Sequence, residues 1–419
     1  MGDSIVEVNM KSGVANALFQ GDIILTKEQQ DQIAAEISEA RSKRQAFDGK
    51  GWLAKLWSEG VPYMFNPYMN EKAKNAFRKA AQLWKEGTCI NFTEYEMPDW
   101  TKPMRVKPSL HRIFGKEHAQ RATVGLVKRG SETLLDTNVA AKYFLVVYPG
   151  DGCESSVGRV KDAGPQELSL GQGCETIGHA AHEIGHALGF FHTHTRHDRD
   201  QFITVEEKNI PSGWKRQFDP QTPETNNNYD LTYDYGSIMH YGTTSGFVGK
   251  EKSIMVPKDG NYTETLGSHI ISFYDLFMMN KLYSCTDACK DEPNIEEKCK
   301  NSGFLHPRDC TKCICPSGYG GDFCETRPQG CGGELVAEGD WKPLKDELDG
   351  SNAAGEKDGF KRCNYWIKAP SDNNKIEVRI VNLPTDIAVE GCTHAGVEIK
   401  AHSDQRLTGY RYTKKNTVI

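Results

Sequence analysis

Three histidines and one glutamate, all within eleven residues, have the types and spacing of a metal-dependent catalytic site. His182 and His186 are four positions apart, so on a helix they project from one face and can bind a single metal ion. Glu183 lies beside them and can act as general base on a metal-bound water. Gly189 can adopt a positive φ that ends the helix and turns His192 toward the same ion. Neutral imidazoles suit zinc, and three ligands leave a catalytic coordination position open.

The complete pattern HExxHxxGxxH is more restrictive than HExxH alone, which a plain helix with two surface histidines also satisfies. A methionine, Met239, follows within the sequence Ser-Ile-Met-His-Tyr and can pack beneath the imidazoles. The long pattern followed by such a Met-turn is the metzincin signature.

Residues 182–200 (HEIGHALGFFHTHTRHDRD) and 237–241 (SIMHY) resemble the astacin family of zinc endopeptidases. The resemblance covers most of residues 45–285. It implies an α+β fold: a two-lobed metzincin catalytic domain with one Zn²⁺ in the cleft. The three histidines would be the zinc ligands, and Met239 would be structural support.

The resemblance also implies a mechanism without a covalent intermediate. Zinc would polarise the scissile carbonyl, and Glu183 would take a proton from the water and return it to the leaving amine. Tyr241 aligns with the family tyrosine that binds zinc in the resting enzyme and swings away to stabilise the oxyanion. The alternative for Tyr241 is an ordinary buried core tyrosine.

Residues 1–44 are predicted to be a pro-segment. Phe19 to Asp22 (FQGD) resembles the family's F-x-G-D motif, whose aspartate occupies the open zinc position; an ordinary Gly-Asp turn is the alternative. A capping box formed by Thr26 and Gln29 predicts a helix over residues 27–42.

The predicted pro-segment ends in Arg41-Ser42-Lys43-Arg44, which fits the R-x-K-R pattern of furin-like processing proteases. A basic helix C-terminus is the alternative. Cleavage after Arg44 would release Asp22 and leave Gln45 as the new N-terminus. Family members often carry glutamate after the third histidine, where it meets that new amine. This chain has Thr193 there, so the activation contact differs.

The elements that must position these residues follow from apolar patterning. Strands are expected at Val61–Phe65, Tyr143–Tyr148 and Glu167–Leu170, and Asn70 should cap an amphipathic helix. A second helix, beginning near Glu175, should carry the histidines. The stretch Pro98–Lys142 gives no clear element and is interpreted as a surface insertion or an artefact of gene prediction.

The 13 cysteines are unevenly distributed, and a dense set at one end of a chain is typical of disulfide-stapled modules in an oxidising compartment. Residues 286–325 resemble an epidermal-growth-factor-like (EGF-like) module, for which a zinc knuckle is the alternative. The resemblance implies the pairs Cys289–Cys310, Cys299–Cys313 and Cys315–Cys324. The resemblance of the catalytic part implies Cys89–Cys285 and Cys153–Cys174.

Residues 331–419 resemble a CUB β-sandwich but are fewer than the roughly 110 residues such a domain needs. Cys331 can pair with Cys363. Cys392 lacks a partner because Thr413 stands near the position of the family's fourth cysteine. The expected tail is therefore a small disulfide-rich module followed by a truncated sandwich.

Composition excludes several partners. The formal net charge is -6 with no basic block, so a nucleic-acid partner is not expected. The apolar stretches are far shorter than the roughly 20 residues that span a bilayer, so no transmembrane helix is expected. The sequons at Asn91 and Asn261 are compatible with glycosylation and secretion, although residues 1–14 show no apolar signal-peptide core.

These observations predict a secreted, zymogen-activated zinc endopeptidase that acts on protein or peptide substrates and is activated by a processing protease at Arg44. The alternative is a catalytically silent extracellular binding protein that acts through its EGF-like and CUB tail. The intact Glu183 and the three histidines favour the enzyme.

Overall fold

The computed structural model describes residues 3–39, 55–96, 127–128, 142–223, 225–244, 252–291, 298–348, 359–371, 374–414 and 417–418. The predicted cleavage site at Arg44 and nearly all of Pro98–Lys142 lie outside these residues.

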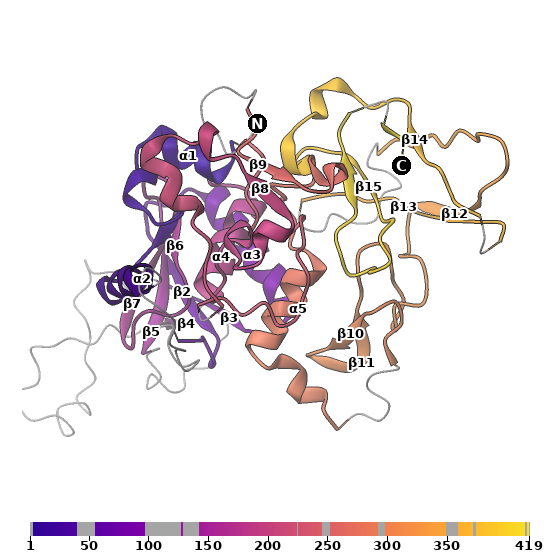
Figure 1. The fold of residues 1–419 in the computed structure, drawn as a ribbon. Helices are drawn as coiled ribbons and strands as arrows, with labels where there is room; N and C mark the ends of the chain where they lie inside the picture. Colours follow the sequence, from indigo (N-terminus) through magenta and orange to yellow (C-terminus); the bar gives the residue numbers. More distant parts are fainter. Residues whose placement is uncertain are drawn as a thin grey trace, which may run out of the picture.

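A mixed seven-stranded sheet forms the centre of the fold (Figure 1). In spatial order its strands are β1 (Ile23–Ile24), β6 (Cys153–Ser156), β7 (Gly164–Leu170), β5 (Tyr143–Tyr148), β2 (Val61–Phe65), β3 (Phe92–Glu96) and β4 (Val127–Lys128). Neighbours from β7 to β3 are parallel, whereas β6 and β4 run antiparallel to the strand they join. β1 comes from the predicted pro-segment and pairs with the edge strand β6 in parallel. Residues 23–24 therefore extend the sheet at β6.

Five α-helices accompany the sheet: α1 (Ile5–Ser12), α2 (Lys27–Glu39), α3 (Glu71–Gly87), α4 (Ile177–Leu188) and α5 (Phe273–Leu282). The predicted cap of α3 is present, because the Asn70 side chain accepts a hydrogen bond from the backbone N–H of Ala73 at 2.8 Å. The predicted box before α2 is present too: Thr26 Oγ1 accepts from the Gln29 N–H, and Gln29 Oε1 accepts from the Thr26 N–H. α1 was not predicted, although Ser4 and Glu7 form a capping box at its start.

Two hydrophobic cores divide the N-terminal two thirds of the chain into two lobes. The sheet lobe packs α3 and α4 against the sheet around Phe77, Trp84 and Leu145. The second lobe is centred on Tyr233, Tyr235 and other residues of 203–266, and it includes the hairpin of β8 (Ile203–Val205) and β9 (Met255–Pro257). Both cores also contain side chains from residues 5–15. Residues 5–15 are therefore packed into both lobes.

Six disulfides are formed, and they are the pairs expected from the sequence: Cys89–Cys285, Cys153–Cys174, Cys289–Cys310, Cys299–Cys313, Cys315–Cys324 and Cys331–Cys363. Cys392 is buried and is the free cysteine. The first pair joins the end of α3 to the segment after α5, and the second closes the loop between β6 and α4.

The tail contains only small sheets within its described residues. One hairpin, β10 (Phe304–His306) with β11 (Asp309–Ile314), lies among the cysteines of the expected EGF-like module. The remaining pairs are β12 (Gly332–Val336) with β13 (Asn364–Lys368), β14 (Arg379–Ile380) with β17 (Thr417–Val418), and β15 (Val397–Ile399) with β16 (Tyr410–Tyr412). The described part of residues 331–418 thus forms three separate two-stranded sheets, and the expected truncated sandwich stays a prediction.

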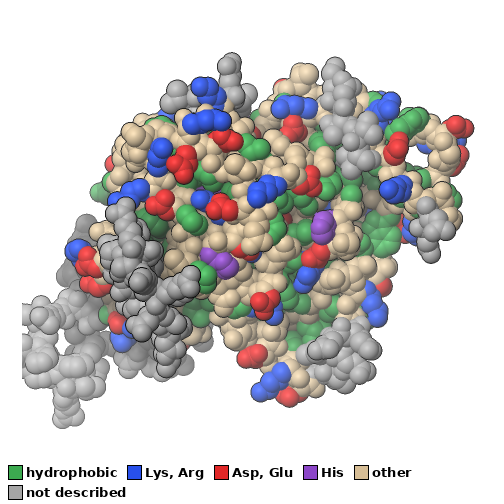
Figure 2. Space-filling model, in the orientation of Figure 1, with side chains coloured by type: hydrophobic (Ala, Val, Ile, Leu, Met, Phe, Trp, Pro, Cys, Tyr) green, Lys and Arg blue, Asp and Glu red, His purple; other side chains and the backbone are tan. Residues whose placement is uncertain are grey.

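The surface carries mixed charge. On the face drawn in Figure 2, lysine and arginine side chains are interspersed with aspartate and glutamate. Among the described residues, no helix combines the length and apolar character needed to cross a membrane.

The packing of the sheet lobe can be tested at Phe77, because this side chain is fully buried between Tyr63 and Phe65 of β2. Phe77→Ala is expected to lower the free energy of unfolding by about 3–5 kcal/mol, since it leaves a cavity in a packed core. The matched control is Tyr68→Ala, because Tyr68 is 88% exposed, and its effect should stay within about 0.5 kcal/mol. Equal losses in a denaturant titration would contradict this packing.

Candidate metal centre

Helix α4 presents the first two histidines from one face. It begins after Thr176, whose side chain accepts a hydrogen bond from the His179 N–H, and it ends at Gly189. Gly189 has a φ of +122°, which only glycine adopts readily, and this turn brings His192 back to the helix. The helix end predicted from the sequence is therefore present, and His182, His186 and His192 meet.

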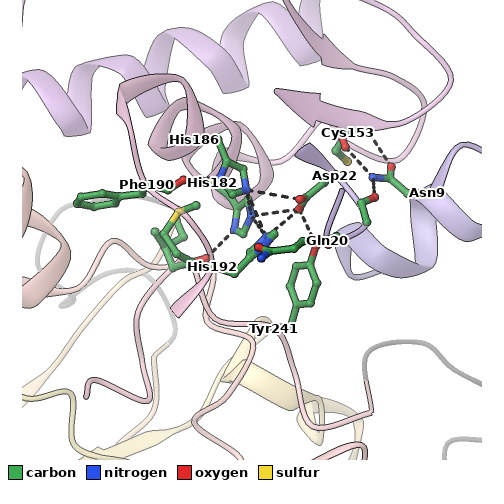
Figure 3. Close-up of polar contacts among 12 residues, drawn as sticks. Asn9, Gln20, Asp22, Cys153, His182, His186, Phe190, His192 and Tyr241 are labelled. Carbon is green, nitrogen blue, oxygen red and sulfur yellow. Dashed lines mark hydrogen bonds and ion pairs between the residues drawn. The ribbon is translucent and has the colours of Figure 1, made fainter. Parts of the chain in front are cut away.

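The Nε2 atoms of the three histidines form a small triangle (Figure 3). The distance is 3.0 Å between His182 and His186, and 3.2 Å from each of them to His192. All three rings are buried. Figure 3 shows the carboxylate of Asp22 beside this triangle.

The Nδ1 atom of each ring faces an oxygen acceptor. His182 Nδ1 lies 2.7 Å from the Ile238 carbonyl oxygen, and His186 Nδ1 lies 2.7 Å from that of Phe190. His192 Nδ1 lies 2.9 Å from Gln20 Oε1. These acceptors place the ring proton on Nδ1, so each Nε2 directs its lone pair toward the other two.

Burial favours the neutral form of the His186 and His192 imidazoles. It lowers the pKa of His192 to about 3 and also lowers the pKa of His186, despite the opposing charge of Asp22. The three lone pairs and the neighbouring carboxylate together create a negative electrostatic potential in a site closed to water. A bound cation would compensate this potential.

Asp22 lies where a fourth ligand would. Its Oδ2 is 3.1 Å from His192 Nε2 and 3.3 Å from His182 Nε2, and its Oδ1 is 3.5 Å from His186 Nε2. Gln20 and Gly21 precede it with φ values of +52° and +91°, so a left-handed turn directs the carboxylate inward. The sequence prediction brought together Asp22 and the three histidines, and so does the structure.

This donor set fits zinc. Ligand atoms around a tetrahedral zinc with N and O bonds near 2.0–2.1 Å are about 3.3 Å apart. The four candidate residues have ligand atoms within 4.8 Å of one another, and Asp22 Oδ1 is buried without a hydrogen-bond partner among the described residues. Three imidazoles and one carboxylate can therefore hold one Zn²⁺.

Glu183 lies next to His182 on α4 and is completely buried. Both of its carboxylate oxygens lack a hydrogen-bond partner among the described residues. Burial, followed by the charges of Asp22 and Glu154, raises the pKa of Glu183 well above its usual range. A carboxyl group with unused acceptor capacity thus lies beside the candidate metal ligands.

Tyr241 is buried, and its hydroxyl contacts Gln20 and Asp22. The hydroxyl oxygen lies 2.6 Å from the Gln20 carbonyl oxygen and 2.8 Å from Asp22 Oδ2, so it donates to one of them. In this unprocessed chain the hydroxyl therefore bonds to the segment that carries Asp22.

The Met-turn, residues 237–241, is fixed against α4 and α5. Met239 packs on Gly185, where a Cβ would lie only 2.6 Å from the methionine sulfur. Asp275 of α5 accepts hydrogen bonds from Ser237 Oγ and the Ile238 N–H at 2.6 and 2.9 Å. This fixes the carbonyl group of Ile238 that holds the first histidine.

Sequence reasoning missed three residues that orient the site: Asn9, Gln20 and Asp275. The Asn9 side chain donates to the carbonyl oxygens of Gly21 and Cys153 at 2.9 and 2.7 Å and accepts from the Cys153 N–H at 2.8 Å. It thereby clamps the Asp22 turn to β6. The capping boxes at Ser4 and Ser272 were available signals for the helices that carry Asn9 and Asp275.

Thr193 stands at the position where family members often carry glutamate. Its hydroxyl donates to Ser237 Oγ at 2.8 Å, and its N–H donates to the Met239 carbonyl oxygen at 2.9 Å. The residue therefore ties the histidine loop to the Met-turn.

The profile of the Astacin peptidase family matches residues 51–108 and 133–284, half of the chain. Zinc metalloproteinase nas-31 of Caenorhabditis elegans is 39% identical over 100% of this chain and 61% of its own length. Zinc metalloproteinase nas-32 of the same organism is 34% identical over 97% of this chain and 54% of its own length. This chain thus spans between about half and three fifths of these relatives.

A solved structure, the hatching enzyme zinc-protease high choriolytic enzyme 1 from Oryzias latipes, aligns with 57% of this chain and 98% of its own chain, at 26% identity and a TM-score of 0.41.

The family profile leaves residues 109–132 unmatched. They lie inside the Pro98–Lys142 stretch interpreted as an insertion.

The geometry makes metal content testable. The purified full chain is expected to bind one Zn²⁺, and His186→Ala should weaken its retention against a chelator by more than roughly 100-fold, because losing even an outer partner of a ligand costs about 10- to 100-fold. His402→Ala removes an exposed histidine and is the control. Equal zinc retention by the two variants would place the metal elsewhere.

Proposed function

Because this chain belongs to the astacin family of peptidases, we propose that it is a zinc-dependent endopeptidase that hydrolyses peptide bonds in protein substrates. The observation that carries the proposal is the buried triangle of Nε2 atoms beside Glu183. A catalytically silent binding protein is not supported by this site, because the base and the three candidate ligands lie together.

The proposed roles follow from the contacts. His182, His186 and His192 would hold the zinc, which when bound polarises a carbonyl group and lowers the pKa of a water. Glu183 would accept a proton from that water and return it to the leaving amine. Tyr241 would donate a hydrogen bond to the oxyanion once the pro-segment no longer occupies its hydroxyl.

We propose that the pro-segment keeps the enzyme latent in two ways. Asp22 takes the position that a water or substrate oxygen would need. β1 pairs with the edge strand β6, whose free backbone groups would otherwise be available to an extended peptide. A processing protease that cuts after Arg44 would detach both, because Asp22 and β1 precede that bond.

The remaining proposals concern compartment and architecture. Six disulfides favour an oxidising compartment and hence secretion. The sequon asparagines Asn91 and Asn261 are exposed and would accept glycans. We assign residues 1–44 to a pro-segment, 45–285 to the protease domain, 286–325 to an EGF-like module and 331–419 to a partial CUB domain. No nucleic-acid partner is proposed.

Peptidase activity depends on Glu183 in this proposal. Chain processed at Arg44 should cleave a quenched fluorescent peptide, and Glu183→Gln should lower kcat/KM by about 10²- to 10⁴-fold, because a general base is lost while the amide keeps the shape. Zinc content, measured on the same samples, should stay at one ion per chain. Glu207→Gln is the control, because Glu207 is an exposed acidic residue paired with Lys215 at 3.5 Å. Unchanged activity in Glu183→Gln would exclude the proposed base.

Latency depends on Asp22. In unprocessed chain, Asp22→Ala should raise peptidase activity by roughly 10- to 100-fold, because each hydrogen bond to a charged group contributes about 1.5–3 kcal/mol. Asp31→Ala in the same segment is the control, because Asp31 forms an exposed ion pair with Lys27. If Asp22→Ala stays as latent as Asp31→Ala, strand pairing alone blocks the site.

The cleavage site is tested separately. N-terminal sequencing of the activated wild-type chain should find Gln45.

A further inference from the structure

The C-terminal segment, defined as residues 390–413, is built into the second lobe. In Figure 1 it is the yellow chain to the right of β8 and β9. It differs from the preceding tail residues, in which large apolar side chains such as Trp341 and Leu344 are about half exposed. Within the C-terminal segment, in contrast, Leu407, Thr408 and Arg411 are at most 6% exposed.

Polar groups of the segment bond to the lobe through buried atoms. Arg411 donates from Nη1 to Ser268 Oγ at 2.7 Å and from its backbone N–H to Thr265 Oγ1 at 3.0 Å. Thr413 donates from its hydroxyl to Glu264 Oε2 at 2.9 Å. Buried polar groups paired this specifically fix one docking geometry, because an undocked segment would leave them unpaired.

Apolar side chains of the segment form a separate small cluster and extend the core of the second lobe. Leu407 forms a small buried cluster with Leu231 and Tyr274 of the protease domain. Tyr410 packs on the ring of Tyr262, with ring centroids 4.6 Å apart. The segment therefore supplies part of the lobe's own packing.

Two glycines of the lobe make room for the segment. A Cβ on Gly236 would lie 2.3, 2.4 and 2.5 Å from Cγ2, Oγ1 and Cβ of Thr408. A Cβ on Gly242 would lie 2.3 Å from Glu390 Oε2. These are closer than non-bonded atoms approach, so the lobe surface is shaped to this segment.

Hydrogen bonds connect Thr408 of the segment to the metal centre. The N–H and hydroxyl of Thr408 each donate to the buried carboxylate of Asp234, at 3.2 Å. The carbonyl oxygen of Asp234 accepts from the N–H of Ser237, at the start of the Met-turn. Ile238 follows Ser237 in the chain, and its carbonyl oxygen lies 2.7 Å from Nδ1 of His182.

We propose that the C-terminal segment is an integral support of the protease domain, in which Thr408 acts through Asp234 as a positioning residue for the Met-turn and hence for His182. This rests on the proposed metal centre but not on peptidase activity. The segment thus belongs functionally to the catalytic domain, in addition to its assignment to the partial CUB domain.

The test uses the unprocessed full chain and the contact between Gly236 and Thr408. Gly236→Ala introduces a methyl group whose three nearest atoms all belong to Thr408, and Thr408→Gly removes those atoms. The variants are Gly236→Ala, Thr408→Gly and the double variant. Gly213→Ala is the matched control, because nothing lies within 4 Å of a Cβ at that position. The measurements are tryptic cleavage at Arg411, melting temperature, and zinc retention against a chelator.

Gly236→Ala is expected to open Arg411 to trypsin, lower the melting temperature by about 2–12 °C and weaken zinc retention by about 10-fold or more. The double variant should return to the values of Thr408→Gly alone. Gly236→Ala behaving like Gly213→Ala would overturn the proposal. So would a double variant more impaired than Thr408→Gly alone, or a released segment with unchanged zinc retention.

These readouts are independent of catalysis. If the rescue pattern holds in a chain that cleaves no peptide, the support role stands and the proposed peptidase function fails. If the peptidase is active but the pattern is absent, the support role alone fails.

Discussion

Three imidazole lone pairs that face one another in a sealed interior are the constraint on which the rest of this structure depends. At separations of 3.0–3.2 Å the Nε2 atoms of His182, His186 and His192 repel one another unless a cation lies between them. Each ring is held in that orientation by an oxygen at its Nδ1. Two of these oxygens are backbone carbonyls, so the path of the main chain determines the metal centre.

The main chain is in turn fixed by a few close contacts. Gly189 allows the sharp turn after α4, and Gly185 lets the Met239 sulfur reach the helix. Asp275 holds the Met-turn from α5. Residues 20–22 complete the arrangement, because Gln20 orients His192 and Asp22 fills the remaining side of the triangle. The same residues therefore order the site and occupy its open side.

The sequence predicted the chemistry better than the supports of the site. The histidine pattern, Asp22 and the strands β2 and β5 were predictable, because helical spacing, a short motif and apolar runs are local signals. The capping boxes were local as well, and that of α2 was used while that of α1 was not. Asn9 could not be foreseen, because its role comes from β6, which lies more than 140 residues away in the sequence.

The tail, too, was predictable only where its sequence has a recognisable pattern. The disulfide pairs were predicted because the cysteines resemble those of known modules, and that resemblance specifies the pairing. The docking of Thr408 on Asp234 joins residues 174 positions apart through ordinary polar side chains, which carry no pattern in the sequence. Contacts of this kind depend on the assembled surfaces of the second lobe and the C-terminal segment rather than on any local propensity.

The most direct test of the central claim is a crystal structure of the unprocessed chain loaded with zinc. We expect one ion bound by Nε2 of His182, His186 and His192 and by the carboxylate of Asp22, with the Tyr241 hydroxyl bonded to Gln20 or Asp22. Zinc bound away from the three histidines, or bound to them with Asp22 turned away and a water in its place, would contradict it.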